Sequence, residues 1–213
     1  MVVAQVFAYL GAIGVSLLAL PQLFKILRDR DSAGVSVWAW IFQAACCGTF
    51  LIYGIVIFEP AQIVGNVLPV IGALAVALMA VSARRTVTFG LIAISAMIGA
   101  AYIAVMFAIP PLMVGFVGTG LSIIARWPQI VDSIRSSRNG KPTNVSTTTW
   151  YFFIGGMGAW MVYGIIALDY PVLITNLIGI LSAVVILIAE YRNPGNRAFK
   201  AEAERKDVAL ANV

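Results

Sequence analysis

The sequence contains no histidine, and only 11% of its 213 residues are charged. Without histidine the chain cannot build a histidine-based catalytic triad, most types of zinc site or the commonest proton relay. Its two cysteines, Cys46 and Cys47, are adjacent in an apolar segment, so they predict neither a disulfide framework nor a metal site. No nucleophile–base pair is evident. We therefore expect no enzyme activity, no metal and no cofactor.

Apolar residues dominate what remains: 61% of the chain is hydrophobic and the mean hydropathy is +0.96. A soluble domain is about half apolar and about a quarter charged. A membrane-spanning helix needs about 20 apolar residues. Such runs occupy residues 3–27, 36–57, 61–83, 87–108, 111–134, 146–168 and 170–191. The first run has no basic start and no cleavage-type ending, so we interpret it as a retained helix. The sequence predicts an all-α membrane protein with seven transmembrane helices.

The positive charges lie on one side of this predicted bundle. All 14 lysines and arginines fall at the first, third and fifth connections or in the C-terminal tail, whereas the second and sixth connections carry only Glu59 and Asp169. Cytoplasmic loops are enriched in basic residues. The N-terminus is therefore predicted outside and the C-terminus in the cytoplasm, with the cell membrane as the expected location. The net charge of +5 then reflects contact with the lipid bilayer, not with nucleic acid.

Two segments of the chain resemble each other. Pro21-Gln22 recurs as Pro128-Gln129, an offset of 107 residues, and beyond the basic loop the offset is 110. The later matches pair Ser36 with Ser146, Tyr53-Gly54 with Tyr163-Gly164, Glu59 with Asp169, and Asn66 with Asn176. The pattern predicts three-helix repeats at residues 1–86 and 109–192, followed by a solvated tail at 193–213. An unmatched helix at 87–108 inverts the second repeat, so that the two become parallel. Parallel repeats favour a substrate site between them, near the middle of the membrane.

The repeated proline–glutamine pairs predict hinges. Proline removes a helical hydrogen bond and kinks the helix. Pro21 and Pro128 lie at equivalent places toward the cytoplasmic ends of the first and fifth helices, where a gate would bend. Gln22 and Gln129 are expected to hydrogen-bond the backbone that each proline frees. A static kink that improves packing is the alternative.

Asn66 and Asn176 lie in the middle of the third and seventh helices. An amide in hydrocarbon needs hydrogen-bond partners. Because the two residues are matched, we predict that they face a common cavity; the alternative is an ordinary interhelical hydrogen bond. Phe50 and Trp160 each precede the matched asparagine by 16 residues. An aromatic ring beside an amide suits a solute with apolar C–H faces and hydroxyl groups.

Other side chains share the face of Phe50 and its match. Cys47 and Met157 are predicted to line the same site, whereas Tyr53 and Tyr163 are expected in general packing or in an interfacial belt. Arg126 is the deepest charged residue, and it is expected to snorkel or to pair on its own helix, where Asp132 follows. No acid lies at mid-depth, which favours facilitated diffusion over proton coupling.

These features together resemble the PQ-loop superfamily. Within it the second repeat, from "PQIVDSIRSSRNGKPTN" to "LITNLIGIL", is most similar to the sugar transporters called SWEETs and the half-size SemiSWEETs. The resemblance covers about residues 1–192 and implies transport of a mono- or disaccharide by alternating access. It also implies that Asn66, Asn176 and Trp160 bind the sugar and that the two prolines are hinges. The second helix lacks the proline of plant-type members, and Phe50 stands opposite Trp160.

Two other functions remain open. One is a proton-coupled PQ-loop exporter of an amino acid or another small solute, which would need a mid-membrane carboxylate. The other is a retrieval-type receptor of related fold, which would need several charged groups in its cavity. A homo-oligomer is compatible with the sequence.

The charge pattern makes a direct prediction about topology. An epitope tag at the N-terminus should be accessible to antibody on intact cells, whereas a tag after Val213 should be accessible only after permeabilisation. Two ends on the same side of the membrane would contradict the count of seven helices.

Overall fold

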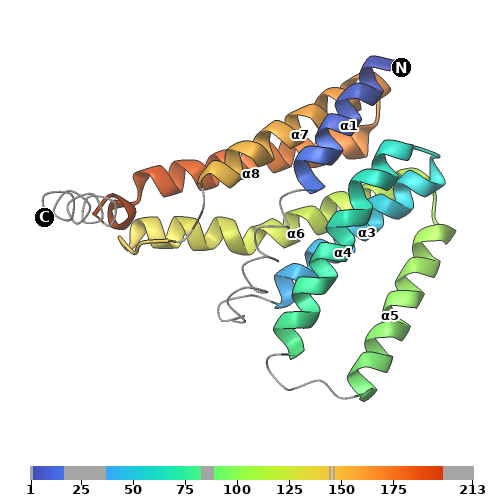
Figure 1. Ribbon diagram of the computed structural model, residues 1–213, viewed down its shortest axis with the longest axis horizontal. Helices are drawn as coiled ribbons and strands as arrows, with labels where there is room; N and C mark the ends of the chain where they lie inside the picture. Colours follow the sequence, from blue (N-terminus) through green and yellow to red (C-terminus); the bar gives the residue numbers. More distant parts are fainter. Residues whose placement is uncertain (1, 17–36, 83–88, 144, 146, 199–213) are drawn as a thin grey trace, which may run out of the picture.

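The computed structural model describes residues 2–16, 37–82, 89–143, 145 and 147–198 of the chain. Within these residues it contains seven α-helices: α1 Val2–Ser16, α3 Val37–Val56, α4 Pro60–Ser82, α5 Phe89–Ala108, α6 Pro111–Arg138, α7 Thr147–Ala167 and α8 Tyr170–Arg192 (Figure 1). By length and composition α3, α4, α7 and α8 can each cross a membrane. This confirms the predicted class, an all-helical membrane protein. The predicted first span, 3–27, is described only as far as α1 extends.

Six helices close into a ring of neighbours. α4 packs against α1 and α3, and α8 packs against α6 and α7. The two groups meet through α1 with α7 and through α3 with α6. Exchanging α1, α3 and α4 for α6, α7 and α8 leaves this set of neighbours unchanged. The arrangement is that of two parallel three-helix units around a common centre.

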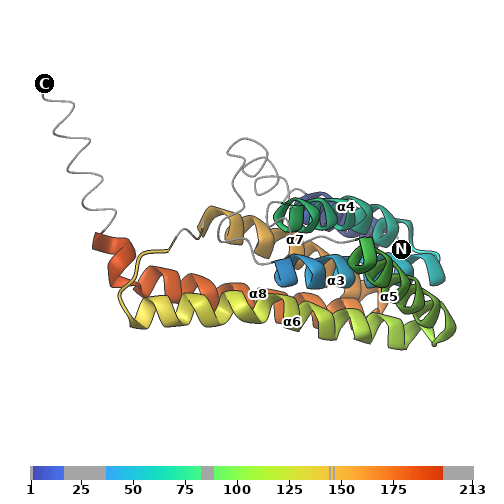
Figure 2. The same cartoon turned by 90° about the horizontal axis from the view of Figure 1, so that it is seen from below.

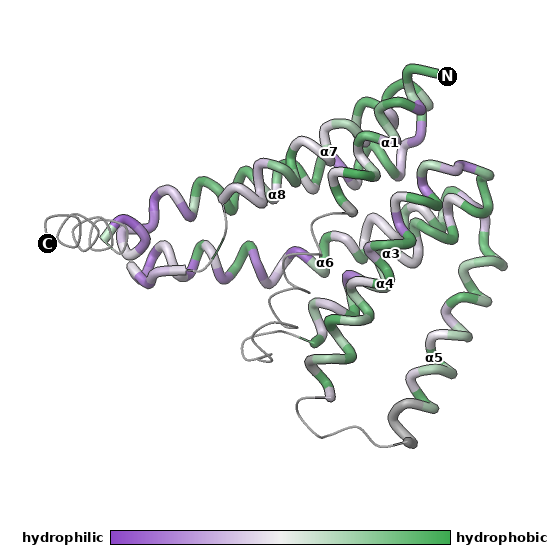
Figure 3. Tube along the Cα trace, viewed as in Figure 1, coloured by the Kyte–Doolittle hydropathy of each residue, from purple (hydrophilic) through white to green (hydrophobic). Residues whose placement is uncertain are grey.

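The linker helix α5 lies outside this ring. Among the described residues its main packing partner is α3 (Figures 1 and 2). Its residues are apolar along its length (Figure 3). α5 therefore connects the two units without entering the space between them.

The turns from α3 to α4 and from α7 to α8 have the same backbone geometry. The backbone N–H of Glu59 donates to the carbonyl of Gly54, with N···O 2.8 Å, and that of Asp169 donates to Gly164, with N···O 2.9 Å. The residue before each acid is exposed and has a positive φ, 56° and 55° respectively. We call the end of the bundle that carries these turns the outer end, after the predicted topology.

Both glycines are required by close helix packing at these turns. A Cβ atom at Gly54 would lie 2.6 Å from the Cβ of Gln62, and one at Gly164 would lie 2.9 Å from the backbone nitrogen of Leu173. Only a residue without a side chain permits this approach. The sequence repeat at these positions thus reflects the same steric requirement in both units.

The opposite end is held by a buried carboxylate of α8. Glu190 is 4% exposed and accepts hydrogen bonds from the Thr143 hydroxyl and from Nδ2 of Asn196, the latter at 2.8 Å. Nδ2 of Asn193 donates to the carbonyl of Lys141 at 2.7 Å. Hydrophilic residues gather at this end, where α6 and α8 run side by side (Figure 3). The expectation of a solvated tail is wrong for residues 193–198, because the buried Glu190 needs polar partners.

Two alanine substitutions within α7 separate close packing from helix propensity. Gly164→Ala should lower the melting temperature of the purified protein in detergent, with a loss of about 1–3 kcal/mol from overpacking. A Cβ atom added at Gly158 would meet no atom within 4 Å, so Gly158→Ala should leave stability unchanged or raise it by up to about 1 kcal/mol. Equal melting temperatures for the two variants would contradict the packing described at the turn.

Candidate functional site

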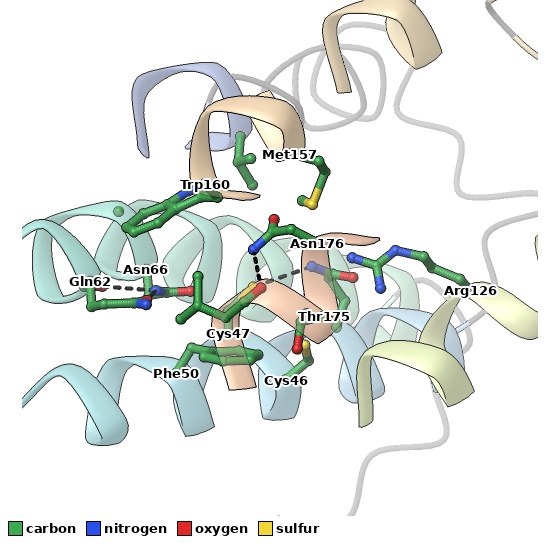
Figure 4. Close-up of a pocket in the computed structure, with 14 residues that line it drawn as sticks. Cys46, Cys47, Phe50, Gln62, Asn66, Arg126, Met157, Trp160, Thr175 and Asn176 are labelled. Atoms are coloured by element: carbon green, nitrogen blue, oxygen red, sulfur yellow. Dashed lines mark hydrogen bonds between the residues drawn. The ribbon is translucent and has the colours of Figure 1, made fainter. Parts of the chain in front are cut away.

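A cavity of about 60 Å³ lies at the centre of the helix ring. Residues from α1, α3, α4, α6, α7 and α8 line it (Figure 4). The lining includes every residue that the sequence predicts for solute binding: Asn66, Asn176, Trp160, Phe50, Cys47 and Met157. The structure thus brings them together, and their role in binding stays a prediction.

The two asparagines make matching hydrogen bonds. Nδ2 of Asn66 donates to the carbonyl of Gln62 at 2.8 Å, and Nδ2 of Asn176 donates to the carbonyl of Val172 at 2.7 Å. Nδ2 of Asn66 also lies 3.4 Å from Oε1 of Gln62. Each bond stays within its own helix, four residues back, and neither amide bonds to another helix within the described part of the chain. The oxygen of each amide and the second N–H of Asn176 are thus available to a molecule in the cavity.

Glycines make room for the aromatic rings beside the asparagines. A Cβ at Gly11 of α1 would lie 2.6 Å from the Trp160 ring, and one at Gly65 of α4 would lie 3.1 Å from it. Phe50 is packed in the same way against Gly118 of α6, at 2.9 Å. Trp160 is only 6% exposed. The rings are therefore fixed in the wall of the cavity by backbone that approaches closely.

Tyrosines and carboxylates from opposite units form what we call the outer latch: Tyr53, Tyr163, Glu59 and Asp169. The Tyr53 hydroxyl donates to Oδ1 of Asp169, and the Tyr163 hydroxyl donates to Oε2 of Glu59, each at 3.0 Å. All four side chains are buried. The expectation of general packing or an interfacial belt for the two tyrosines is wrong, because buried carboxylates require donors and these hydroxyls supply them.

Further donors complete the coordination of both carboxylates. Nε2 of Gln5 donates to the two oxygens of Glu59 at 3.0 and 2.9 Å, and the backbone N–H of Ala61 donates to Oε1 at 3.2 Å. Asp169 accepts from the backbone N–H of Val172 at 3.2 Å and so caps α8. Burial raises the pKa of Asp169 above its usual value, although the Val172 and Tyr53 bonds oppose this; the nearby charge of Glu59 raises it further.

Each latch tyrosine also touches the aromatic ring that lines the cavity. Trp160 and Tyr163 meet edge to face, with ring centroids 5.5 Å apart, and Phe50 and Tyr53 do so at 6.3 Å. Two aromatic pairs therefore connect the wall of the cavity with the carboxylates at the outer end. The matched spacing of aromatic, tyrosine and acid was visible in the sequence, but the crossing between units was not.

Polar residues that sequence reasoning did not assign to the site also line the cavity. Nε2 of Gln62 is buried and has no hydrogen-bond partner in the described residues. The Thr175 hydroxyl is 2.6 Å from that of Thr119. Arg126 donates from Nη1 to the carbonyl of Ser122 at 3.0 Å and forms no ion pair with Asp132. The helical spacing of Gln62 and Asn66 was the one signal in the sequence that could have identified Gln62.

The predicted hinges are only partly described. Pro21 and Gln22 lie outside the described residues. Pro128 lies inside α6, which continues to Arg138, four residues beyond the predicted end. Nε2 of Gln129 is 3.5 Å from the Ser133 hydroxyl. This side-chain contact replaces the expected bond to the freed backbone, because Ser133 lies one turn further along the same face.

Known proteins resemble the chain at two levels. No protein-family model matches it. An uncharacterised protein of Methanocaldococcus jannaschii is 25% identical over 81 residues, which are 38% of this chain and 84% of that protein. The fold is similar to that of a eukaryotic SWEET transporter, with a TM-score of 0.71 and 15% identity, over 89% of this chain and 94% of that one. The second likeness establishes a SWEET-like fold.

The raised pKa of Asp169 predicts how stability depends on pH. The folded state binds this proton more readily than the unfolded chain, so the contribution of Asp169 to stability is present at low pH and is lost as the pH rises. Asn imitates the protonated form. Asp169→Asn should therefore raise the melting temperature most at about pH 8 and progressively less toward about pH 4. Asp132→Asn, away from the latch on α6, is the control. A pH-independent difference for Asp169→Asn would contradict the assignment.

Proposed function

We propose that the protein is a membrane transporter that moves a small solute of the sugar class by alternating access. The observation that carries this proposal is the cavity at the centre of the ring, to which each unit contributes one asparagine amide and one aromatic ring. A transporter built from parallel repeats binds its substrate at such a place. The SWEET-like fold supports the same function.

The chemistry of the lining suits a polyhydroxylated solute. Each asparagine keeps its oxygen for a hydroxyl group, Asn176 keeps one N–H as well, and the unpartnered Nε2 of Gln62 adds a donor. Trp160 and Phe50 offer apolar surface for the C–H faces of a sugar ring. Hydrogen bonds to the hydroxyls would supply selectivity, because an unmatched amide in the site loses its water without compensation.

The volume of the cavity identifies a conformational change that transport requires. Pockets for small molecules usually have about 300–1,000 Å³, far more than the 60 Å³ present. The outer latch joins the two units above the cavity, so the structure corresponds to a state closed on the outer side and contracted around the site. Loading a sugar requires the units to separate. We assign the bending to Pro128 and, outside the described residues, to Pro21.

The lining also bears on the alternative of a proton-coupled amino-acid exporter. Among the described residues that line the cavity, none is acidic. An amino acid would place its ammonium group there without a carboxylate partner, which is costly in a partly dry site. Facilitated diffusion of a sugar-like solute at the cell membrane is therefore the function we favour over that exporter.

Alanine substitutions test the site. Asn66→Ala and Asn176→Ala should each weaken binding of the transported sugar by about 1–3 kcal/mol, because one hydroxyl loses its partner. That is about a 5- to 150-fold loss, measurable by isothermal titration on purified protein. The melting temperature should change little, since each amide bonds only within its own helix among the described residues.

The control for these variants is Asn139→Ala at the exposed end of α6, which should bind normally. If the asparagines served only packing, the outcome would be the reverse. Both variants would then melt earlier, and each folded molecule would bind as well as the unsubstituted protein. Intact affinity in the double variant would refute the site.

A further inference from the structure

The cavity contains a positive charge that transport of a neutral sugar does not explain. Arg126 of α6 lines it together with both asparagines. Its Cζ atom lies 5.3 Å from the centroid of the Phe153 ring, and Nη2 lies 3.7 Å from the position that a Cβ on Gly179 would occupy. Figure 4 shows the guanidinium directed into the site, on the side of Asn176.

The described part of the chain does not neutralise this charge. Arg126 forms no ion pair with a carboxylate there, and the Ser122 carbonyl engages one of its five N–H donors. The two buried acids of the outer end, Glu59 and Asp169, are already bonded to the latch tyrosines. The face of Phe153 is attracted to a cation but cannot accept the remaining N–H groups. Several donors of a permanently charged group therefore remain for a ligand.

The direction of the side chain excludes simple escape to the membrane surface. Arginines between membrane helices normally snorkel to the interface, pair with an acid, or face an aqueous cavity. Arg126 bonds a carbonyl one turn nearer the outer end, which moves its head away from the end of α6 at Arg138. It pairs with no described acid, so it belongs to the third group. A cation held in a solute cavity is expected to bind an anion.

We propose that the transported solute is an acidic sugar, whose carboxylate binds Arg126 while its hydroxyl groups bind Asn66 and Asn176. This inference rests on the proposed function and narrows its substrate class. A planar guanidinium matches a carboxylate with two parallel hydrogen bonds. A phosphate ester, with about two negative charges, would leave one of them without a partner, because Arg126 is the one cationic residue in the described lining.

The two units are unequal at this position, which agrees with a solute that has one charged end. The offset of 107 residues pairs Arg126 with Ala19 in the sequence. Gln62 is paired likewise with Val172, so the amide donor and the cation come from different units. A solute with hydroxyls at one end and a carboxylate at the other thus meets two chemically different sides in one preferred orientation.

Full-length protein in proteoliposomes tests this inference with three probes: D-glucose, D-glucuronate and D-glucose 6-phosphate. We expect glucuronate to bind about 10- to 100-fold more tightly than glucose, the gain typical of a charge-assisted hydrogen bond. Its uptake should carry an electric current, whereas glucose uptake should not. Arg126→Gln should abolish the preference, and Arg126→Lys should keep part of it, because lysine retains the charge without the fork. Arg135→Gln, exposed on the same helix, should behave like the unsubstituted protein.

The other outcomes have distinct meanings. Equal binding of glucose and glucuronate, unchanged in Arg126→Gln, would overturn the inference and leave the proposed function intact. Binding of none of the three probes would overturn both. Preference for glucose 6-phosphate, lost in Arg126→Gln, would overturn the assignment of a carboxylate. Should Arg126→Gln fail to fold, the probe comparison with the unsubstituted protein and with Arg126→Lys decides.

Discussion

Two hydrogen bonds that cross between the units, from Tyr53 to Asp169 and from Tyr163 to Glu59, hold the outer end of the molecule together. A buried carboxylate is costly unless donors surround it, and neither unit satisfies its own acid alone. Each unit therefore needs the tyrosine of the other. Because the tyrosines touch Trp160 and Phe50, breaking the latch and widening the cavity would involve the same side chains. This link couples access at the outer end to the shape of the site.

The two units share their mechanical parts and differ in their chemical ones. The latch, the tight glycine turns and the asparagines are matched between them. The other polar groups of the cavity are not, since Gln62, Thr175 and Arg126 correspond to Val172, Gly65 and Ala19 in the repeat. Symmetry in the moving parts allows both sides to open by related motions. Asymmetry in the lining allows one solute to be bound in one orientation.

Several predictions from the sequence agree with the structure because they depend on local properties. Long apolar runs must be helices in a bilayer, since each backbone polar group needs a partner within its own segment. The repeat at a constant offset implied equal units, and the ring of neighbours has that form. Predictions about single side chains were less accurate. The tyrosines were expected in packing or a belt, Gln129 at the backbone, and the residues after Asn193 in solvent. Each error concerned the partner of a polar group.

The sequence by itself determined the class of the protein, the approximate extent of its helices and the pairing of equivalent positions, because hydropathy and repetition are properties of the chain. Tertiary structure alone decided that Tyr53 bonds the acid of the other unit, that glycines of α1 and α4 accommodate Trp160, and that Arg126 has no described acidic partner in the cavity. Hydrogen bonds and close approach depend on distances between helices far apart in the chain, and no local pattern encodes those distances.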